Sequence, residues 1–142
     1  MSGMKIRPYI TFDGQCKEAV ELYKKAFKTD TLELMLFSDM PPMPGRELPE
    51  EYKGRVLQAT LKFGDDFIRM SDCADHGLNE RETERLSLAF EASEDAVRHA
   101  FDTLKKDGRV GMELEETFYS PCFGVVFDKF GVMWNLAATP IG

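Results

Sequence analysis

The sequence predicts an α+β protein built from two tandem βαβββ modules, and two observations lead to this prediction. Segments rich in aromatic and branched apolar residues alternate with segments whose apolar residues recur every three or four positions, as in strands and amphipathic helices. The order strand, helix and three strands occurs in both halves of the 142-residue chain. We therefore expect a first module at about 4–72, a second at about 84–139, and a single domain over 1–142.

The first module opens with a strand, a helix and a second strand. Residues 5–12 are apolar and aromatic and end at an Asp-Gly turn signal. In residues 15–27 the apolar side chains repeat at helical spacing, while lysines and glutamates occupy the other side. Residues 31–37 predict a strand, whereas residues 38–54 carry four prolines and two glycines, which a sheet does not accommodate. We expect 38–54 to be a long loop, placed to act as a lid.

A hairpin completes the first module. Residues 55–63 and 67–70 predict two short strands, and the Gly-Asp-Asp segment between them has the length and composition of a hairpin turn. The polar and charged residues 71–83 predict a linker to the second module.

The second module repeats this order. Residues 86–91 predict a strand, and Ser93, followed by two acidic residues, predicts the start of a helix. The helix is expected to end at Lys105, Lys106 and Gly108, because cations and glycine favour helix C-termini. Three further strands are predicted at 110–117, 124–127 and 132–138.

Composition excludes several classes of function. The net charge of −7 and the lack of a Lys/Arg cluster argue against nucleic acid as a partner. No apolar run approaches the length of a membrane span, and the first residues lack the apolar stretch of a secretory signal, so we expect a cytoplasmic protein without a membrane partner. Cys16, Cys73 and Cys122 form no CxxC pair, so reduced structural thiols are expected.

Four segments carry a family resemblance. They are PYITFDGQCKEAVELYKKAF at 8–27, RMSD at 69–72, ETFYSPCFG at 116–124 and DKFGVMWNL at 128–136. With these segments in this order, the chain resembles the PhnB-like branch of the vicinal oxygen chelate superfamily, which includes glyoxalases, extradiol dioxygenases and bleomycin-resistance proteins.

The resemblance implies a glyoxalase/bleomycin-resistance-like rolled mixed sheet with flanking helices, a pocket in each half-barrel and commonly a homodimer, which we expect here. It leaves open whether the modules pair within one chain or between two. This fold hosts several chemistries, so no reaction is implied. Some relatives carry a demethylubiquinone-methyltransferase label. Because no strand here is followed by a glycine-rich loop for a nucleotide-like methyl donor, we do not predict methyl transfer.

The resemblance also allows a test for a metal site. Metal-dependent members place His or Glu ligands on the first and last strands of each module, and this pattern selects Pro8, Gln58, Leu88 and Asn135. None offers the carboxylate or imidazole that divalent metals require, and a shift by one residue does not change this. We expect no metal and no cofactor. The donor-rich segment 73–76, Cys-Ala-Asp-His, is more typical of a solvated loop.

Without a metal, Gln58 and Asn135 become candidate pocket residues, because an amide among apolar strand residues must find hydrogen-bond partners. The alternative is that each amide satisfies a strand edge or a water molecule. Thr60 follows Gln58 on the same strand face. Tyr9 is a candidate aromatic wall. Phe118 belongs to an aromatic group expected to pack mostly in the core, and is itself a candidate pocket residue.

Arg69 is a candidate cationic anchor for an anionic ligand. A salt bridge from Arg69 to Asp72 or Glu33 is the alternative, and it is slightly favoured.

Three functions remain compatible with the sequence. We expect a metal-independent protein that binds a small molecule of unknown identity and has no catalytic residues. The alternative is a lyase-type or oxygenase-type enzyme of the superfamily that uses a non-standard metal site, or side chains such as Glu113, Glu115 or Tyr119. The third is a protein that acts only through its dimer surface. A hydrolase is not predicted, because no nucleophile lies in a G-x-S-x-G turn and His99 falls on a charged helix face.

Overall fold

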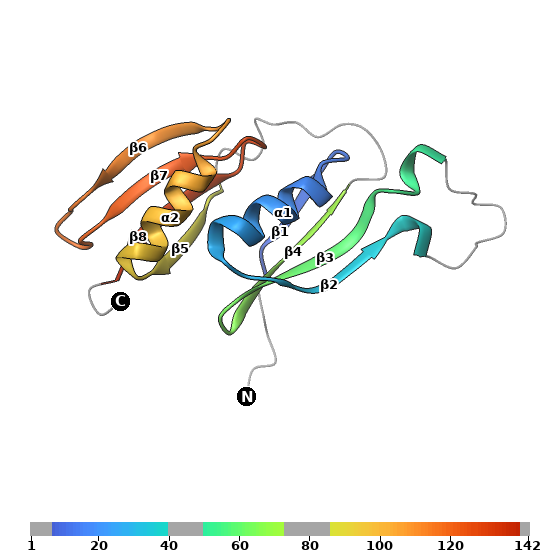
Figure 1. Ribbon diagram of the computed structural model, residues 1–142, viewed down its shortest axis with the longest axis horizontal. Helices are drawn as coiled ribbons and strands as arrows, with labels where there is room; N and C mark the ends of the chain where they lie inside the picture. Colours follow the sequence, from blue (N-terminus) through green and yellow to red (C-terminus); the bar gives the residue numbers. More distant parts are fainter. Residues whose placement is uncertain (1–6, 40–49, 73–85, 140–142) are drawn as a thin grey trace. The chain divides into compact units, whose positions relative to one another are not determined.

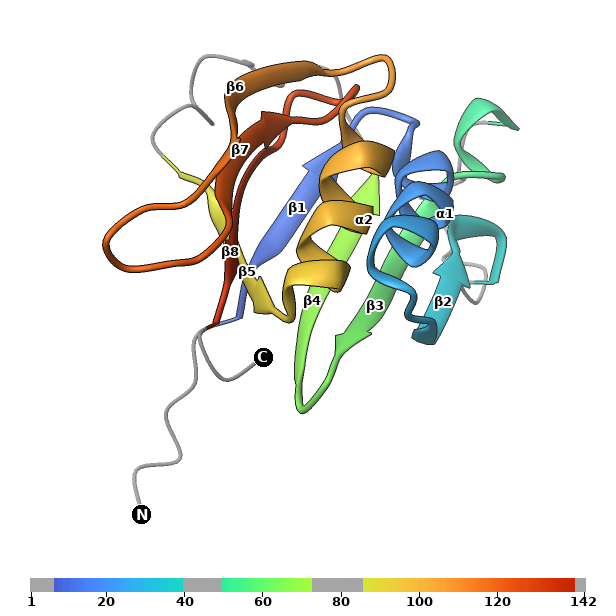
Figure 2. The same cartoon turned by 60° about the vertical axis from the view of Figure 1, so that its left-hand side comes forward.

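The computed structural model describes residues 7–39, 50–72 and 86–139. The chain divides into two compact units, Met1–Lys24 with Thr29–Leu78 and Lys25–Lys28 with Asn79–Gly142. Each unit contains one four-stranded sheet that combines parallel and antiparallel pairs (Figures 1 and 2). The predicted α+β class and the repeated βαβββ order are confirmed.

The first unit has the strand order β1-β4-β3-β2, with β1 parallel to β4 and the other pairs antiparallel. Two short 3-10 turns follow β2: η1 (Phe37–Asp39) begins at Phe37, which was predicted to end the strand, and η2 (Glu50–Tyr52) lies in the predicted loop. Residues 40–49, the middle of the predicted lid at 38–54, fall outside the described residues. The main elements are β1 (Tyr9–Phe12), α1 (Cys16–Phe27), β2 (Thr31–Leu36), β3 (Val56–Phe63) and β4 (Asp66–Asp72).

The predicted start of the linker is wrong, because β4 continues through Ser71 and Asp72 and both residues are buried. Polar residues suggested a solvated segment, but the side chain of Asp72 is satisfied by backbone groups. Its carboxylate accepts hydrogen bonds from the backbone N–H groups of Cys16 and Val56, each at 2.9 Å. A buried carboxylate with such partners is stable inside a protein.

The two faces of the first sheet differ. The residues on one face of the sheet are buried, as are the apolar residues of α1. Asp72 lies on this face and accepts a hydrogen bond from Cys16, the first residue of the helix. Because side chains alternate along a strand, the neighbouring residues point to the face opposite α1. The buried apolar residues of α1 and of the helix-covered face include Ala19, Val20, Tyr23, Ala59, Leu61, Ile68 and Met70.

The second unit repeats the topology with the order β5-β8-β7-β6, and β5 is parallel to β8. Helix α2 covers the face that carries the buried Trp134 and Leu136, and this packing is visible in both views (Figures 1 and 2). The elements are β5 (Leu88–Ala92), α2 (Glu94–Leu104), β6 (Arg109–Glu115), β7 (Phe123–Phe127) and β8 (Met133–Ala138).

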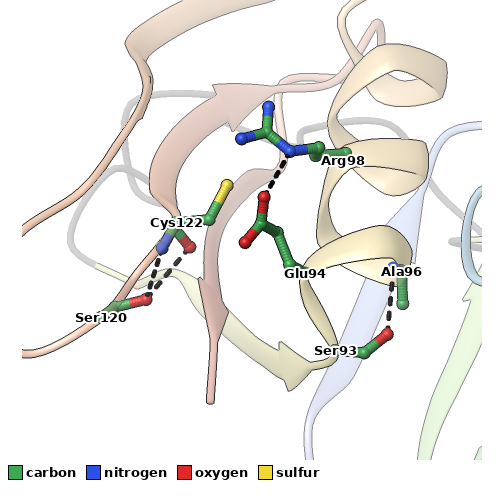
Figure 3. Close-up of polar contacts among 6 residues, drawn as sticks. All are labelled: Ser93, Glu94, Ala96, Arg98, Ser120 and Cys122. Carbon is green, nitrogen blue, oxygen red and sulfur yellow. Dashed lines mark hydrogen bonds and ion pairs between the residues drawn. The ribbon is translucent and has the colours of Figure 1, made fainter. Parts of the chain in front are cut away.

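The ends of α2 test two sequence predictions. The N-cap at Ser93 is confirmed, since its hydroxyl oxygen accepts from the N–H of Ala96 at 3.2 Å (Figure 3). The prediction that Gly108 ends the helix as a C-terminal glycine is wrong. The left-handed residue is Asp107, with φ of 59°. Gly108 is instead needed for close approach, since a Cβ there would lie 2.3 Å from the carbonyl oxygen of Phe127.

No helix in the described part of the chain is long and apolar enough to cross a membrane.

Candidate functional site

A row of polar and aromatic side chains crosses the face of the first sheet opposite α1. Tyr9 on β1 pairs with Arg69 on β4, and Arg69 pairs with Thr60 on β3. Thr60 in turn pairs with Glu33 on β2, so the row extends over all four strands. Paired residues in neighbouring strands project to the same face. The strand register therefore brings together three of the residues predicted from the sequence.

Gln58 lies on the same face, two residues before Thr60 on β3. Its cross-strand partner on β2 is Met35, which is 40% exposed. Four predicted pocket residues, Tyr9, Gln58, Thr60 and Arg69, thus share one face of one sheet. Their exposure differs, since Tyr9 is 54% exposed whereas Thr60 is buried.

A basic cluster, missed by the sequence analysis, lies around Phe67 on this face. The Phe67 ring centroid is 4.1 Å from the guanidinium carbon of Arg7 and 5.5 Å from that of Arg69. Lys62 is the cross-strand partner of Phe67. We call Arg7, Lys62 and Arg69 the basic cluster. The sequence could have indicated this cluster through the alternation of side chains on β3 and β4. Alternation places Lys62 on the same face as Thr60, and Phe67 on the same face as Arg69.

The salt bridge predicted for Arg69 is not found within the described residues. The carboxylate of Asp72 lies on the helix-covered face, where it accepts the two backbone hydrogen bonds already described. Glu33 has no recorded ion pair in the described ranges, although it belongs to the same row as Arg69. The guanidinium of Arg69 instead lies near the aromatic ring of Phe67.

The positions selected by the superfamily metal pattern do not fit a divalent metal. Gln58 lies on β3, whereas the last strand of the first unit is β4, so this part of the sequence assignment was wrong. The residues of β4 on the face opposite α1 are Phe67, Arg69 and Ser71, which offer no carboxylate or imidazole. The described ranges contain no group of three or more His, Cys, Asp or Glu side chains arranged to hold a metal. Residues 73–76 fall outside these ranges.

Asn135, the predicted pocket residue of the second unit, lies on β8 and pairs with Ala89 and Val125. Its amide nitrogen donates a hydrogen bond to the hydroxyl oxygen of Ser87 at 2.5 Å. This contact supplies a partner for the amide, and the partner is a serine hydroxyl rather than the strand edge or water molecule of the alternative. Asn135 belongs to the second unit, whereas Gln58 belongs to the first.

The second unit contains a hollow of about 210 Å³, lined by Glu91, Tyr119, Ser120, Ala137, Ala138 and Thr139. Phe118, the predicted residue of this region, does not line it and is fully exposed. Its neighbour Tyr119, which lines the hollow, is 52% exposed. Two of the lining residues are alanines, whose side chains occupy little space. In the sequence, the adjacent Ala137 and Ala138 and the aromatic residue Tyr119 were the features that could have indicated the hollow.

Ser120 anchors the wall of this hollow. Its hydroxyl lies 2.7 Å from the carbonyl oxygen of Ala138 and 3.1 Å from that of Cys122, and it accepts from the N–H of Cys122 at 3.2 Å. Figure 3 shows the contacts between Ser120 and Cys122, with the ion pair of Glu94 and Arg98 on α2 nearby. The loop that carries Tyr119 is thereby tied to the ends of β7 and β8.

The thiols of the described residues are poor nucleophiles. Burial raises the pKa of the Cys122 thiol, an effect that Arg98 opposes. Burial, assisted by the negative charge of Asp72, raises the pKa of Cys16 to about 12. Since the thiolate is the reactive form, neither group is poised for nucleophilic catalysis.

Comparisons with known proteins agree with this fold. A family model described as 3-demethylubiquinone-9 3-methyltransferase matches residues 4–137. Protein YjdN of Escherichia coli is 29% identical, over 94% of each chain. The crystal structure of PA1353 from Pseudomonas aeruginosa has a TM-score of 0.78 at 27% identity, and covers 96% of this chain and 98% of its own.

Two further solved structures resemble the chain. The PhnB protein of Bacillus cereus has a TM-score of 0.74 at 25% identity, over 96% of this chain and 100% of that chain. The fosfomycin resistance protein FosX of Listeria monocytogenes has a TM-score of 0.64 at 10% identity, over 99% of this chain and 94% of its own. The likeness to FosX shows the fold alone. The resemblance to the PhnB-like branch of the vicinal oxygen chelate superfamily is confirmed.

Proposed function

This chain belongs to the PhnB-like family described as 3-demethylubiquinone-9 3-methyltransferase, and we propose that it is a metal-independent binding protein for a small organic anion. The proposed site is the face of the first sheet opposite α1. The observation that carries the proposal is the register that aligns Tyr9, Arg69 and Thr60 on three neighbouring strands.

The charges on this face support an anionic ligand. The basic cluster of Arg7, Lys62 and Arg69 outnumbers Glu33, although the chain as a whole carries a net charge of −7. A guanidinium group recognises carboxylate and phosphate groups through paired, charge-assisted hydrogen bonds. In an acidic protein, such a local excess of positive charge favours a small anion over a large polyanion, which the rest of the surface would repel.

Aromatic and polar side chains on the same face support an organic ligand. Tyr9 and Phe67 provide ring surface beside the basic cluster, and Gln58 offers both a donor and an acceptor. Sites of this kind combine apolar surface with a few polar groups that fix the orientation of the ligand. We therefore expect an aromatic or otherwise apolar molecule with a carboxylate or phosphate group.

The family description does not extend the proposal to methyl transfer. The sequence lacks a glycine-rich loop after a strand, which would hold the phosphate groups of a nucleotide-like donor. A metal is likewise not part of the proposal, because the residues at the superfamily positions do not fit one. Elemental analysis and a thermal-shift titration with zinc, nickel, manganese and iron(II) test that part directly. We also expect a homodimer, which sedimentation velocity measures.

The binding proposal is tested with benzoate and benzamide as matched probes, followed by ¹H–¹⁵N correlation spectra of the full chain. Benzoate should shift the amide resonances of β1, β3 and β4 saturably, whereas the neutral benzamide should bind about tenfold more weakly. Arg69→Gln should weaken benzoate binding by a similar factor.

Arg98→Gln is the matched control, because Arg98 lies on the exposed surface of α2 and pairs with Glu94. It removes the same charge from the chain and should leave benzoate binding unchanged. Equal binding of benzoate to the wild type and Arg69→Gln, or no saturable shift with benzoate, contradicts the proposal.

A further inference from the structure

The hollow of the second unit carries an acidic side chain, unlike the basic cluster of the first unit. Its lining residues are Glu91, Tyr119, Ser120, Ala137, Ala138 and Thr139. Its floor is apolar at Ala137, whose methyl group lies on the same face of the sheet as Glu91, whereas Ala138 points to the buried face under α2. At about 210 Å³ it is several times larger than the volume that one water molecule occupies, about 30 Å³ in the liquid. The hollow therefore has room for a compact organic group.

A carboxylate supplies the charge of the hollow. Glu91 lies on β5 and is the cross-strand partner of Ala137, so its side chain projects to the same face as the apolar floor. Glu91 forms no ion pair within 7–39, 50–72 and 86–139, and none of the lining residues is a lysine or arginine. The charge of Glu91 is thus available to a ligand rather than neutralised by a described neighbour.

An aromatic ring completes the site. Tyr119 lines the hollow and is held edge-on against Phe123, with the ring centroids 5.4 Å apart at 72°. Phe118 contacts Tyr119 from another direction, at 5.0 Å and 86°. Because Tyr119 keeps 52% of its surface exposed, ring surface remains for a ligand.

The polar groups of Ser120 and Thr139 are already used. The Ser120 hydroxyl is committed to the carbonyl oxygens of Ala138 and Cys122, and the N–H of Thr139 donates to Ala92 at 2.9 Å. Glu91, Tyr119 and Ala137 then offer a ligand a carboxylate, an aromatic ring with its hydroxyl, and a methyl group. A compact organic cation satisfies all three, since cations bind aromatic faces and carboxylates while alkyl groups fill the apolar floor.

From this combination we propose that the hollow binds a small alkylammonium group. The site lies within the second unit and does not depend on the anion site proposed for the first unit. The net charge of −7 supports the same preference, because it raises the local concentration of cations near the protein.

Choline chloride and 3,3-dimethyl-1-butanol test the proposal, because the alcohol replaces the charged nitrogen of choline with a neutral carbon of the same shape. In ¹H–¹⁵N correlation spectra of the full chain, choline should shift the resonances of Tyr119, Ala137 and Thr139 saturably. The alcohol should bind about fivefold more weakly or worse. Equal affinities, or no saturable shift with choline at up to about 50 mM, overturn the proposal.

Variants separate the two recognition elements. Glu91→Gln and Tyr119→Leu should each weaken choline binding by about fivefold, whereas Tyr119→Phe, which keeps the aromatic face, should retain it. Glu113→Gln removes an acidic residue that does not line the hollow and should have no effect. A Glu91→Gln variant that is folded and binds choline as well as the wild type rejects the site. Arg69→Gln should not change choline binding, so failure of the anion proposal is distinguishable from failure of this one.

Discussion

The carboxylate of Asp72, the last residue of β4, accepts a hydrogen bond from the backbone N–H of Cys16, the first residue of α1, at 2.9 Å. Its other oxygen accepts from the N–H of Val56 at the start of β3, also at 2.9 Å. One buried side chain therefore satisfies two backbone donors that belong to different elements. It also places negative charge at the positive end of a helix.

Replacing Asp72 should destabilise the first unit. Asp72→Ala leaves two backbone N–H groups without this acceptor and should lower the free energy of unfolding by about 3 kcal/mol. Asp72→Asn keeps one acceptor oxygen and should cost less. Denaturant unfolding followed by circular dichroism measures both. The control is Asp102→Ala on the exposed face of α2, where an ion pair to Lys105 is lost and the change should stay within about 0.5 kcal/mol.

The Cys16 thiol should resist modification in the folded chain. Burial and the nearby Asp72 raise its pKa to about 12 from an ordinary value of 9.0, so almost no thiolate is present at pH 8. In a Cys73→Ser/Cys122→Ser background, reaction with a disulfide reagent should occur only after denaturation. Rapid stoichiometric labelling of the native protein would falsify the structural placement of this thiol.

The same shift predicts how stability depends on pH. The unfolded chain releases the Cys16 proton near pH 9, whereas the folded chain retains it to about pH 12. Above about pH 9 the unfolded state therefore binds fewer protons, and the free energy of unfolding should fall as pH rises through this window. The contribution is fully present below pH 9. Cys16→Ala should show a shallower fall than the wild type between pH 8 and about 10.5, measured under reducing conditions.

Trp134, the single tryptophan, should report the integrity of the β7–β8 turn. Its indole N–H donates to Asp128 at 3.0 Å, and the other carboxylate oxygen of Asp128 accepts from the N–H groups of Phe130 and Val132. Asp128→Ala should lower stability by about 2–3 kcal/mol and shift the Trp134 emission to longer wavelength as water gains access. Lys106→Ala, an exposed change, is the control. If Asp128→Ala is destabilised but its emission spectrum is unchanged, Asp128 does not control the environment of the Trp134 indole.

The residues after α2 offer a matched pair of substitutions. A side chain at Gly108 would collide with the backbone oxygens of Phe127 and Leu104, at 2.3 and 2.8 Å, so Gly108→Ala should cost about 2 kcal/mol or more. Asp107 has a φ of 59°, which glycine adopts readily, so Asp107→Gly should change stability by less than about 1 kcal/mol. Thermal unfolding of both variants measures the difference. Equal losses of stability in Gly108→Ala and Asp107→Gly would mean that backbone conformation, rather than the close approach at Gly108, determines the cost of substitution in this segment.

Local patterns in the sequence predicted the elements well. The two helices, the Ser93 cap and the order of the eight strands follow from apolar periodicity and turn residues, which act over a few neighbouring positions. The boundaries were less certain where polar residues are buried. Ser71 and Asp72 extend β4 because distant backbone groups satisfy the carboxylate, and no local pattern contains that information.

The sequence by itself determined the family, the repeated βαβββ order and a set of pocket candidates. Only the tertiary structure decided which candidates lie together. Tyr9, Thr60 and Arg69 are distant in sequence, and the parallel β1–β4 pair and the antiparallel β3–β4 pair align them. The same applies to the hollow, since Glu91 reaches Ala137 only through the β5–β8 pair. Strand register is set by long-range hydrogen bonding and burial, so residue spacing along the chain cannot specify it.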